Sequence, residues 1–180
     1  MRIKFALVVL AGFLSQFLIR ASAGEAPAEE YRVKGAFLLN FAKFVEWPPQ
    51  AFKGPDDPIG ICVLGESPFN PALEAAARAI VVEKRSLVIR QIPDVQQGRQ
   101  CQILFVSVAE RKRVRGMLEA VSGSSVLTVG ESDGFIAAGG IVEFRVDDGK
   151  VKMEINAPAA VRAGLHISAK LLSLAQAGKK

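Results

Sequence analysis

The sequence lacks most of the residues from which enzymes build catalytic sites. It has one histidine, His166, and two cysteines in 180 residues, and the cysteines form no Cys-x-x-Cys pair. A zinc site would therefore be short of ligands, and a nucleophilic side chain would lack its commonest general base. Neither a Gly-x-Gly-x-x-Gly loop nor a Walker loop is present, and no acid pair has a spacing that singles it out for glycosidase chemistry. We expect no catalytic residues, no metal ion and no cofactor.

Apolar runs of membrane-spanning length are also missing, and the longest run lies at the amino terminus. It extends from Phe5 to Ile19, follows the basic head Met1–Lys4 and precedes Ala21-Ser22-Ala23. This layout is typical of a secretory signal peptide. The run would span about 22 Å as a helix, short of the roughly 30 Å hydrocarbon core, so we favour cleavage over an uncleaved anchor. We expect a cut after Ala23, export to the periplasm and no membrane insertion of the mature chain.

A strong excess of positive charge is missing from the mature chain. Removal of residues 1–23 leaves 20 basic and 18 acidic side chains, so most of the basic balance belongs to the signal peptide. The densest basic cluster, Arg111-Lys112-Arg113 with Arg115, lies on a predicted helix beside Glu110 and Glu119. We interpret it as a solvated helix face and expect no nucleic-acid partner. Residues 24–180 have the length of one ordinary domain.

What the chain does contain is an alternation of short apolar strands with helices. Strands are expected over 59–64, 86–92, 102–106, 125–129, 141–146 and 151–155. Helices are expected over 29–46, 70–80, 109–121 and 168–177, and Asn70 and Asn156 are placed to cap helices. The alternation predicts an α/β fold with a mainly parallel, Rossmann-like sheet and crossover helices. The Asp148-Gly149 turn adds an antiparallel carboxyl-terminal hairpin.

One local feature repeats at the ends of two predicted strands. Gly65-Glu66-Ser67 recurs as Gly130-Glu131-Ser132, and Ser107 ends a third strand at the same edge. Ligands of open α/β sheets bind at the carboxyl edge, where glycine permits close approach and the side chains offer donors and acceptors. These residues are candidate ligand-binding residues. The alternative is that each segment only turns the chain and caps the following helix.

An aromatic stripe is the main candidate for contact with a partner. Phe37, Phe41 and Phe44 recur at helical spacing and are followed by Trp47. Aromatic residues concentrate at the centres of interfaces, but such a stripe also serves to fill a core. Both interpretations stay open at the level of the sequence.

Cys62 and Cys101 are an even pair in a chain expected in an oxidising compartment. A single disulfide is the natural expectation there, and two buried free thiols are the alternative. A bridge that closes a loop of about 40 residues would contribute on the order of 3 to 4 kcal/mol. The resulting domain needs no metal ion to fold.

Longer stretches of the chain resemble the YfiR family of periplasmic proteins. The resemblance begins at Glu30–Lys34 and continues through Phe37-Leu38 and Asn40–Pro48. Further similar segments are Ile61–Gly65 with Pro68-Phe69, Cys101–Ser107, Val126–Glu131, Gly134-Phe135, Gly139–Ile141, Glu154–Asn156, and Ala163–Leu165 with Ile167-Ser168 and Lys170–Leu172. Their order, and their coverage from about residue 30 to 175, make the resemblance specific.

The resemblance implies a dimeric periplasmic inhibitor of a membrane-bound diguanylate cyclase. Such a protein binds the periplasmic sensor domain of the cyclase, favours its inactive state, and lowers cyclic di-GMP and biofilm formation. Cys62 and Cys101 match in place the disulfide pair of the family, whereas a second cysteine pair near the carboxyl-terminal hairpin is absent here. Our hypothesis is a non-enzymatic, homodimeric regulator. The alternative is a periplasmic small-molecule binding module that uses the carboxyl edge of the sheet.

Overall fold

The computed structural model of the protein describes residues 25–69 and 71–177. The expected signal peptide, the expected cleavage after Ala23 and the cap expected at Asn70 lie outside the described residues. The helices are α2 (Glu25–Phe44), α3 (Pro71–Arg78), α4 (Val95–Gly98), α5 (Val114–Ala120), α6 (Ala157–Arg162) and α7 (Ala169–Ala177), and the 3-10 segments are η1 (Pro49–Ala51) and η2 (Val108–Arg113). The strands are β1 (Val45–Glu46), β2 (Ile59–Leu64), β3 (Val81–Val82), β4 (Arg85–Ile92), β5 (Ile103–Val106), β6 (Leu127–Gly130), β7 (Val142–Asp147), β8 (Lys150–Ile155) and β9 (His166–Ile167).

A seven-stranded, mainly parallel sheet forms the centre of the fold. Its strand order is β3-β4-β2-β5-β6-β7-β8. The five strands from β4 to β7 run parallel, and the edge strands β3 and β8 are antiparallel to their neighbours. The predicted α/β fold class is therefore confirmed. Since parallel strands end at the same edge, the segments that follow β2, β5 and β6 lie next to one another.

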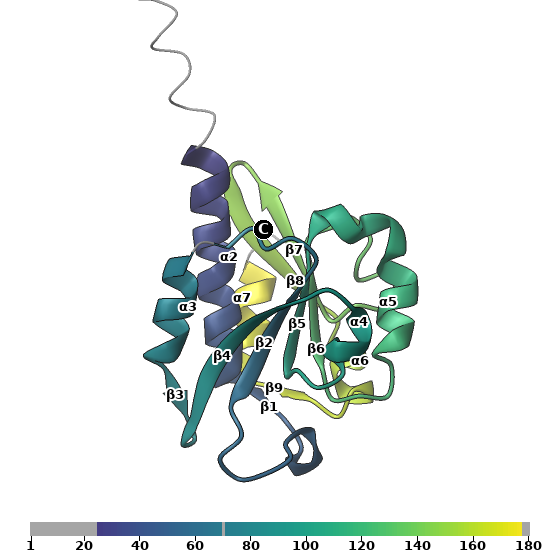
Figure 1. Ribbon diagram of the computed structural model, residues 1–180. Coiled ribbons are helices and arrows are strands. Elements are labelled where there is room, and N and C mark those ends of the chain that lie inside the picture. Colours follow the sequence, from purple (N-terminus) through teal and green to yellow (C-terminus); the bar gives the residue numbers. More distant parts are fainter. Residues whose placement is uncertain (1–24, 70, 178–180) are drawn as a thin grey trace, which may run out of the picture.

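Helices cover both faces of this sheet (Figure 1). α2, α3 and α7 lie on one face, and α4 and α5 lie on the other. In β2, Ile61 and Val63 pack into the first layer, whereas Cys62 and Leu64 pack into the second. Every residue of β2 is buried as a result. This double coverage explains why the central strands are continuous apolar runs in the sequence.

The long helix α2 supplies the main apolar stripe of the first layer. Leu38 and Phe41 are fully buried against the sheet. The sequence pattern predicts helix as far as residue 46, but α2 ends at Phe44. The reason is that Val45–Glu46 pairs with His166–Ile167 as the antiparallel strands β1 and β9. Two-residue strands have too few positions to show a period, and so the pattern does not reveal them.

β7 and β8 form the predicted carboxyl-terminal hairpin. Asp147 pairs with Lys150, which leaves Asp148-Gly149 as a two-residue turn with φ angles of 50° and 69°. Tight hairpins of this kind need positive φ at both central residues, and Asp-Gly meets that need. A second hairpin, which the sequence analysis does not anticipate, joins β3 to β4 through Glu83-Lys84, also at positive φ.

Two further stretches differ from the sequence-based expectation. Residues 109–121 are expected as one helix, but the 3-10 segment η2 runs to Arg113 before α5 begins at Val114. Ser107 gives no side-chain cap to η2. The four-residue helix α4 is capped by Asp94, whose carboxylate accepts from Gln96 N at 3.0 Å. A helix of that length is too short for its periodicity to be recognised.

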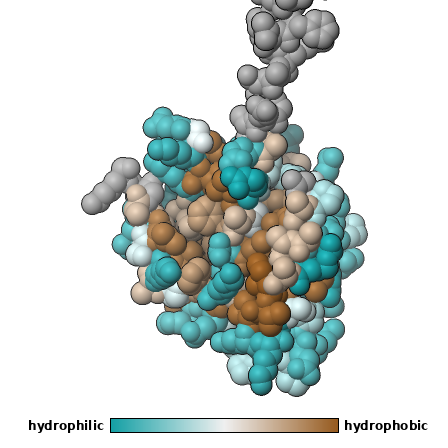
Figure 2. Space-filling view, turned by 90° about the vertical axis from the view of Figure 1, so that its left-hand side faces the viewer, coloured by the Kyte–Doolittle hydropathy of each residue, from teal (hydrophilic) through white to brown (hydrophobic). Residues whose placement is uncertain are grey.

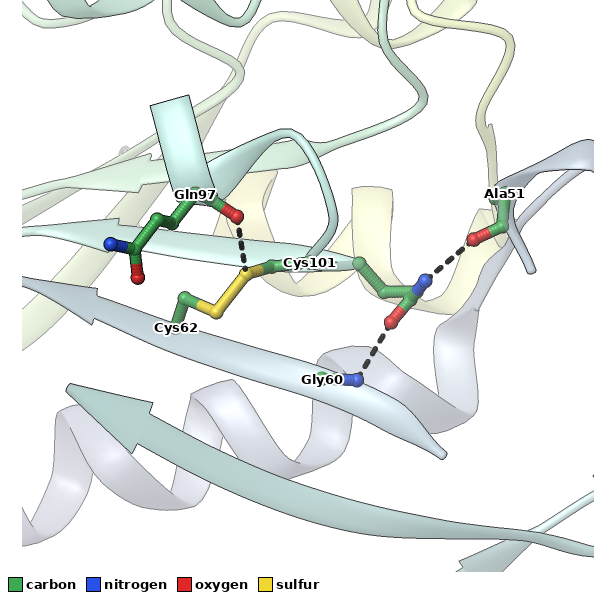
Figure 3. Close-up of a disulfide and its surroundings, with 6 residues drawn as sticks. Ala51, Gly60, Cys62, Gln97 and Cys101 are labelled. Atoms are coloured by element: carbon green, nitrogen blue, oxygen red, sulfur yellow. Dashed lines mark hydrogen bonds between the residues drawn. A yellow bond between two sulfur atoms is a disulfide. The ribbon is translucent and has the colours of Figure 1, made fainter. Parts of the chain in front are cut away.

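A disulfide joins Cys62 in β2 to Cys101, just before β5 (Figure 3). The two Cα atoms are 6.0 Å apart, and the sequence separation is 39 residues. The bridge implied by the resemblance is therefore present. The sulfur of Cys101 lies 3.5 Å from the carbonyl oxygen of Gln97. Because a disulfide sulfur carries no proton, this approach is a contact and not a hydrogen bond.

Gln102, next to the bridge, ties three segments together at the amino end of β5. Its Oε1 accepts a hydrogen bond from Gly60 N, and its Nε2 donates to the carbonyl of Ala51, both at 2.7 Å. Figure 3 shows these two bonds reaching β2 and the η1 segment. Trp47 Nε1 donates to the backbone carbonyl of Gln102 at 3.1 Å. The buried amide is thus satisfied, and it fixes η1 against the sheet.

Candidate functional site

The carboxyl edge of the sheet brings together the segments expected to form a site. β2, β5 and β6 are adjacent, and their last residues are in register. Gly65–Ser67, Ser107 and Glu131-Ser132 therefore follow three neighbouring strand ends. The environment of each side chain decides what this juxtaposition can do.

Glu131 is the best-defined ionisable group at this edge, and its carboxylate is engaged by the protein. Lys34 Nζ lies 2.5 Å from Oε2, and Oε1 accepts hydrogen bonds from Val108 N at 2.8 Å and from the Tyr31 hydroxyl at 3.1 Å. The side chains of Lys34 and Glu131 are only 4% and 3% exposed. Lys34 also pairs with Glu30, one turn earlier in α2. The carboxylate therefore anchors α2 to the sheet, and a ligand would have to displace one of its partners.

Tyr31 extends this cluster toward α3. Burial, the charge of Glu131 and the hydrogen bond to it together raise the pKa of the Tyr31 phenol well above its ordinary value of about 10. Tyr31 therefore keeps its proton and remains a donor to Glu131. Lys34 Nζ lies 4.8 Å from the Tyr31 ring centroid, within cation–π range, and the ring meets Phe69 edge-on at 5.8 Å.

The first Gly-Glu-Ser segment forms a turn with an exposed carboxylate. Gly65 has a φ of 82°, and its N–H donates to the Ile92 carbonyl at 3.3 Å. Ser67 Oγ accepts from Phe69 N at 3.3 Å. Glu66 is exposed, and within the described part of the chain its carboxylate has no hydrogen bond or ion pair. Two members of this segment therefore shape the turn, and Glu66 faces solvent.

The second Gly-Glu-Ser segment is fixed by an aromatic ring. Phe135 is fully buried between Gly130 and Gly140, where a Cβ atom would lie 2.3 Å and 2.2 Å from ring carbons. Ser132 is 7% exposed, and its carbonyl accepts from Phe135 N at 3.1 Å. Gly130 thus lets the ring pack on the backbone, which is a structural use of glycine and not a ligand approach.

Residues 130–134 also fit the Gly-x-Ser-x-Gly spacing of serine hydrolases. The fold does not bring the histidine of this chain to Ser132. His166 is exposed in β9 and pairs with Glu46, beyond the carboxyl end of α2. Glu131, next to Ser132, instead contacts Lys34, about 15 Å before that end along the helix axis. Ser132 therefore lies near the middle of α2, whereas His166 lies beyond its carboxyl end.

Ser107 holds a buried polar atom that calls for a physical explanation. The residue is 5% exposed, and its Oγ has no hydrogen-bond partner among the described residues. Buried hydroxyls ordinarily have one. Among the candidate ligand-binding residues, Ser107 thus keeps an unused hydrogen-bonding group inside the fold.

The aromatic residues of the predicted partner-binding stripe pack chiefly inward. Phe41 is fully buried and lies 6.0 Å from the ring of Phe144, and Phe37 lies 5.8 Å from that same ring. Phe37, Phe44 and Trp47 are half-buried. Phe41 therefore serves the core, while the other three keep part of their surface.

An apolar groove that the sequence analysis does not anticipate lies between α2 and α3. It encloses about 340 Å³, and its lining includes Tyr31, Phe69 and Leu73. Gly35 permits the close approach of the two helices, since a Cβ atom there would lie 2.8 Å from Leu73 Cδ1. Figure 2, which views the molecule from the α3 side, shows hydrophobic patches separated by hydrophilic residues. The helical spacing of Phe69, Leu73 and Ala76 is the sequence signal for this groove.

Residues 25–69 and 71–177 also bear on three other kinds of site. No group of three or more His, Cys, Asp or Glu side chains there could hold a metal ion. None of the helices in that part of the chain has both the length and the hydrophobicity needed to span a bilayer. The basic cluster of η2 and α5 is exposed, and Arg113 lies 3.4 Å from Glu110.

Comparison with known proteins identifies the family. The model of the YfiR/HmsC-like family matches residues 31–176, and the chain belongs to this family. No curated protein matches the sequence significantly. Among solved structures, the chain is similar to a conserved domain protein of Vibrio cholerae O1 biovar El Tor, with 17% sequence identity and a TM-score of 0.46. The similarity covers 65% of this chain and 53% of the Vibrio chain, so it spans about half the length of that protein.

Family membership gives the functional class. The YfiR/HmsC-like family is one of periplasmic regulators. A regulator of this class works through contact surfaces. The exposed groups and grooves of the fold are therefore the features to test.

Proposed function

We propose that the protein inhibits a membrane-bound diguanylate cyclase by binding the cyclase's periplasmic sensor domain. The match of the YfiR/HmsC-like family to residues 31–176 is the observation that carries this proposal. A protein that binds the inactive state of the sensor domain preferentially lowers the population of the active state. Cyclic di-GMP and biofilm formation fall as a result.

The active form in this proposal is residues 24–180, a single domain released by cleavage after Ala23 and acting as a homodimer in the periplasm. The signal-peptide layout of residues 1–23 supports it. Mass spectrometry of the periplasmic fraction is expected to find Gly24 as the first residue, and light scattering is expected to give twice the mass of the mature chain. An uncut protein in the cytosol with both thiols free would contradict the proposal.

The distribution of polar and apolar groups supports a binding role. At the sheet edge, Glu131 and Lys34 are buried and paired with each other. Apolar surface is instead available on the side of α2 and α3, where a groove of about 340 Å³ lies open. We propose that the sensor domain contacts this side. Phe37 and Phe44 face β7 and α7, around α2 from the groove, so the surface that they retain would extend the contact to that side of the helix.

Deletion of the gene tests the function directly. Cellular cyclic di-GMP, measured by mass spectrometry, is expected to rise several-fold, and the intact gene is expected to restore it. A version without residues 1–23 stays in the cytoplasm and is expected not to restore it, which isolates the periplasmic requirement. An unchanged cyclic di-GMP level in a strain with its periplasm-facing cyclases intact would overturn the proposal.

Two matched variants test the contact surface. Ala36 is exposed and lines the groove, so Ala36→Arg places a long charged side chain in it. Gly116 on α5 has nothing within 4 Å of its Cβ position and lies on the other face, so Gly116→Arg adds the same charge elsewhere. Ala36→Arg is expected to lose co-purification with the sensor domain, whereas Gly116→Arg is expected to keep it. Equal retention by both variants would place the contact on another surface.

The second candidate function is that of a small-molecule binding module at the carboxyl edge. The buried, unpartnered Oγ of Ser107 favours it, because a ligand acceptor or donor would satisfy that group. A ligand that binds only the folded state raises the melting temperature. Thermal denaturation against a panel of metabolites is expected to reveal such a ligand, and Ser107→Ala is expected to reduce the shift. Equal shifts for wild type and Ser107→Ala would remove this candidate.

A further inference from the structure

A polar groove lies at the end of the sheet opposite to the carboxyl edge. It encloses about 290 Å³ beside the amino ends of β2 and β5, next to the disulfide. Its walls come from the loop after η1, from β4 and from the segment between α4 and β5. Gly60 forms part of the floor, two residues before Cys62 and therefore on the same face of β2. The absence of a side chain at Gly60 leaves the space open.

The hydrogen-bond acceptors of this groove are largely used by the protein. Gln102 Oε1 accepts from Gly60 N at 2.7 Å. Asp57 Oδ2 accepts from the backbone N–H groups of Lys53 at 2.6 Å and Gly54 at 3.0 Å. The amide and the carboxylate oxygen are therefore occupied in shaping the walls.

The donors of the groove are largely unused. Among the described residues, neither the Arg90 guanidinium nor the Lys53 ammonium has a hydrogen bond or an ion pair. Arg99 donates one N–H to the Ala120 carbonyl at 2.6 Å, which leaves its other N–H groups available. Arg85, by contrast, is committed to the carbonyls of Gly54 and Asp57 and to the ring of Phe52. The groove thus holds three cations with unused N–H donors, Arg90, Arg99 and Lys53, and one carboxylate, that of Asp57.

An excess of positive charge with spare donors and engaged acceptors is complementary to an anion. Guanidinium groups present planar donor pairs that match the oxygens of phosphate and carboxylate groups, and an ammonium adds a point charge. The volume is close to the lower limit for small-molecule sites. Arg90, Arg99 and Lys53 come from three separate segments of the chain and meet in one concave site.

We propose that this groove is a binding site for a small oxyanion, the phosphate or carboxylate group of a small molecule. Arg90 and Arg99 donate to its oxygens, and Lys53 balances its charge. The site is separate from the carboxyl edge and from the α2 and α3 groove. It depends neither on the proposed partner nor on Ser107.

Isothermal titration of the mature protein tests the site with inorganic phosphate as one probe and succinate as the other. Sodium chloride holds the ionic strength constant, because surface charge effects are screened by salt. Saturable binding is expected for at least one probe. Binding of phosphate alone assigns a phosphate ligand, and binding of succinate alone assigns a carboxylate ligand.

Three variants locate the binding. Arg90→Gln removes a charged donor and is expected to raise the dissociation constant by about tenfold or more. Lys53→Gln, in an exposed loop, is expected to raise it less. Arg115→Gln removes the same charge from the exposed face of α5 and is expected to bind as the wild type does.

Two outcomes would overturn the proposal. One is the absence of saturable binding for both probes. The other is equal weakening in Arg90→Gln and Arg115→Gln, which would show general attraction between a cationic surface and anions. Lys53→Gln keeps the test valid should Arg90→Gln fail to fold, because Lys53 is exposed and carries no contact of the core.

Discussion

The same three residues, Gly-Glu-Ser, follow two strands of one sheet and have opposite roles. Glu66 is exposed to solvent, whereas the Glu131 side chain is 3% exposed and holds Lys34 and Tyr31. The difference comes from the neighbouring element, because α2 supplies Lys34 and Tyr31, the two side chains that contact the Glu131 carboxylate. A short motif therefore does not determine the burial or the role of its carboxylate, and the element packed against it does.

The largest expected difference between the two segments is in the carboxylates. Glu131→Gln leaves Lys34 buried with Glu30 as its remaining acid, and it is expected to reduce the free energy of unfolding by about 3 kcal/mol. Glu66→Gln changes an exposed group and is expected to stay within about 0.5 kcal/mol of the wild type. Urea unfolding measures both. Similar losses of unfolding free energy in the two variants would contradict the different roles assigned to Glu131 and Glu66.

A double substitution separates the ion pair from its packing. Lys34→Met with Glu131→Leu replaces two buried charges by apolar side chains of similar size. Such replacements are often neutral. The double variant is expected to recover most of the stability lost in Glu131→Gln, and failure to recover it would show that the hydrogen bonds to Val108 and Tyr31 matter more than the charges.

The second-largest expected effect concerns the glycines of the two segments, Gly130 and Gly65. Gly130→Ala forces a methyl group against the buried ring of Phe135, where a Cβ atom would lie 2.3 Å from a ring carbon. Overpacking of this kind is expected to cost about 2 kcal/mol of unfolding free energy, measured by urea denaturation. Recovery of stability in the double variant with Phe135→Leu would identify the clash as the cause, and a loss below the error of the method would contradict it.

Gly65→Ala is expected to have a smaller effect, through backbone strain. Its φ of 82° is unfavourable for a residue with a Cβ atom and costs about 1 kcal/mol. Gly116→Ala is the control, because it is in α5 with open space around its Cβ position and is expected to stabilise slightly. The urea midpoint is expected to be lowest for Gly130→Ala, higher for Gly65→Ala and highest for Gly116→Ala. A reversed order would refute the distinction between the two glycines.

The smallest expected effect is in the titration of Tyr31. The folded state raises the pKa of this phenol, so stability is fully present below pH about 10 and falls as the pH rises further. Tyr31 is the one tyrosine of the chain, and tyrosinate absorbance therefore reports on it alone. Glu131→Gln is expected to shift the titration to lower pH, whereas Glu66→Gln is expected to leave it unchanged. Identical titrations for the wild type and Glu131→Gln would contradict the assigned cause.

The fold was largely predictable because its elements carry local signals. β2 is buried on both faces, so its sequence is a continuous apolar run, and the predicted bounds equal the observed ones. Asp148-Gly149 correctly predicts the position of the carboxyl-terminal hairpin. The strands β1, β3 and β9 have two residues each, so they depend on pairing partners and carry no pattern of their own. η2 departs from the expected helix at a stretch without a side-chain cap.

The candidate sites were less predictable because their members are far apart in sequence. Lys34 and Glu131 are 97 residues apart, and nothing local to either residue indicates the pairing. Parallel strand order brings Gly65, Ser107 and Glu131 to one edge, as the sequence suggests, but it does not say which of them is covered. Arg90 belongs to a recognisable strand, yet its place in a groove depends on two other segments.

The disulfide has a consequence for how the protein matures. With two cysteines, the chain allows one intramolecular pairing, so oxidation cannot trap a mispaired isomer. A chain with a single possible bridge needs an oxidant and has no use for a disulfide isomerase. Since Cys101 is 39 positions after Cys62, the bridge forms only after the intervening β4 and α4 have been synthesised. It then links the neighbouring strands β2 and β5 at the centre of the sheet.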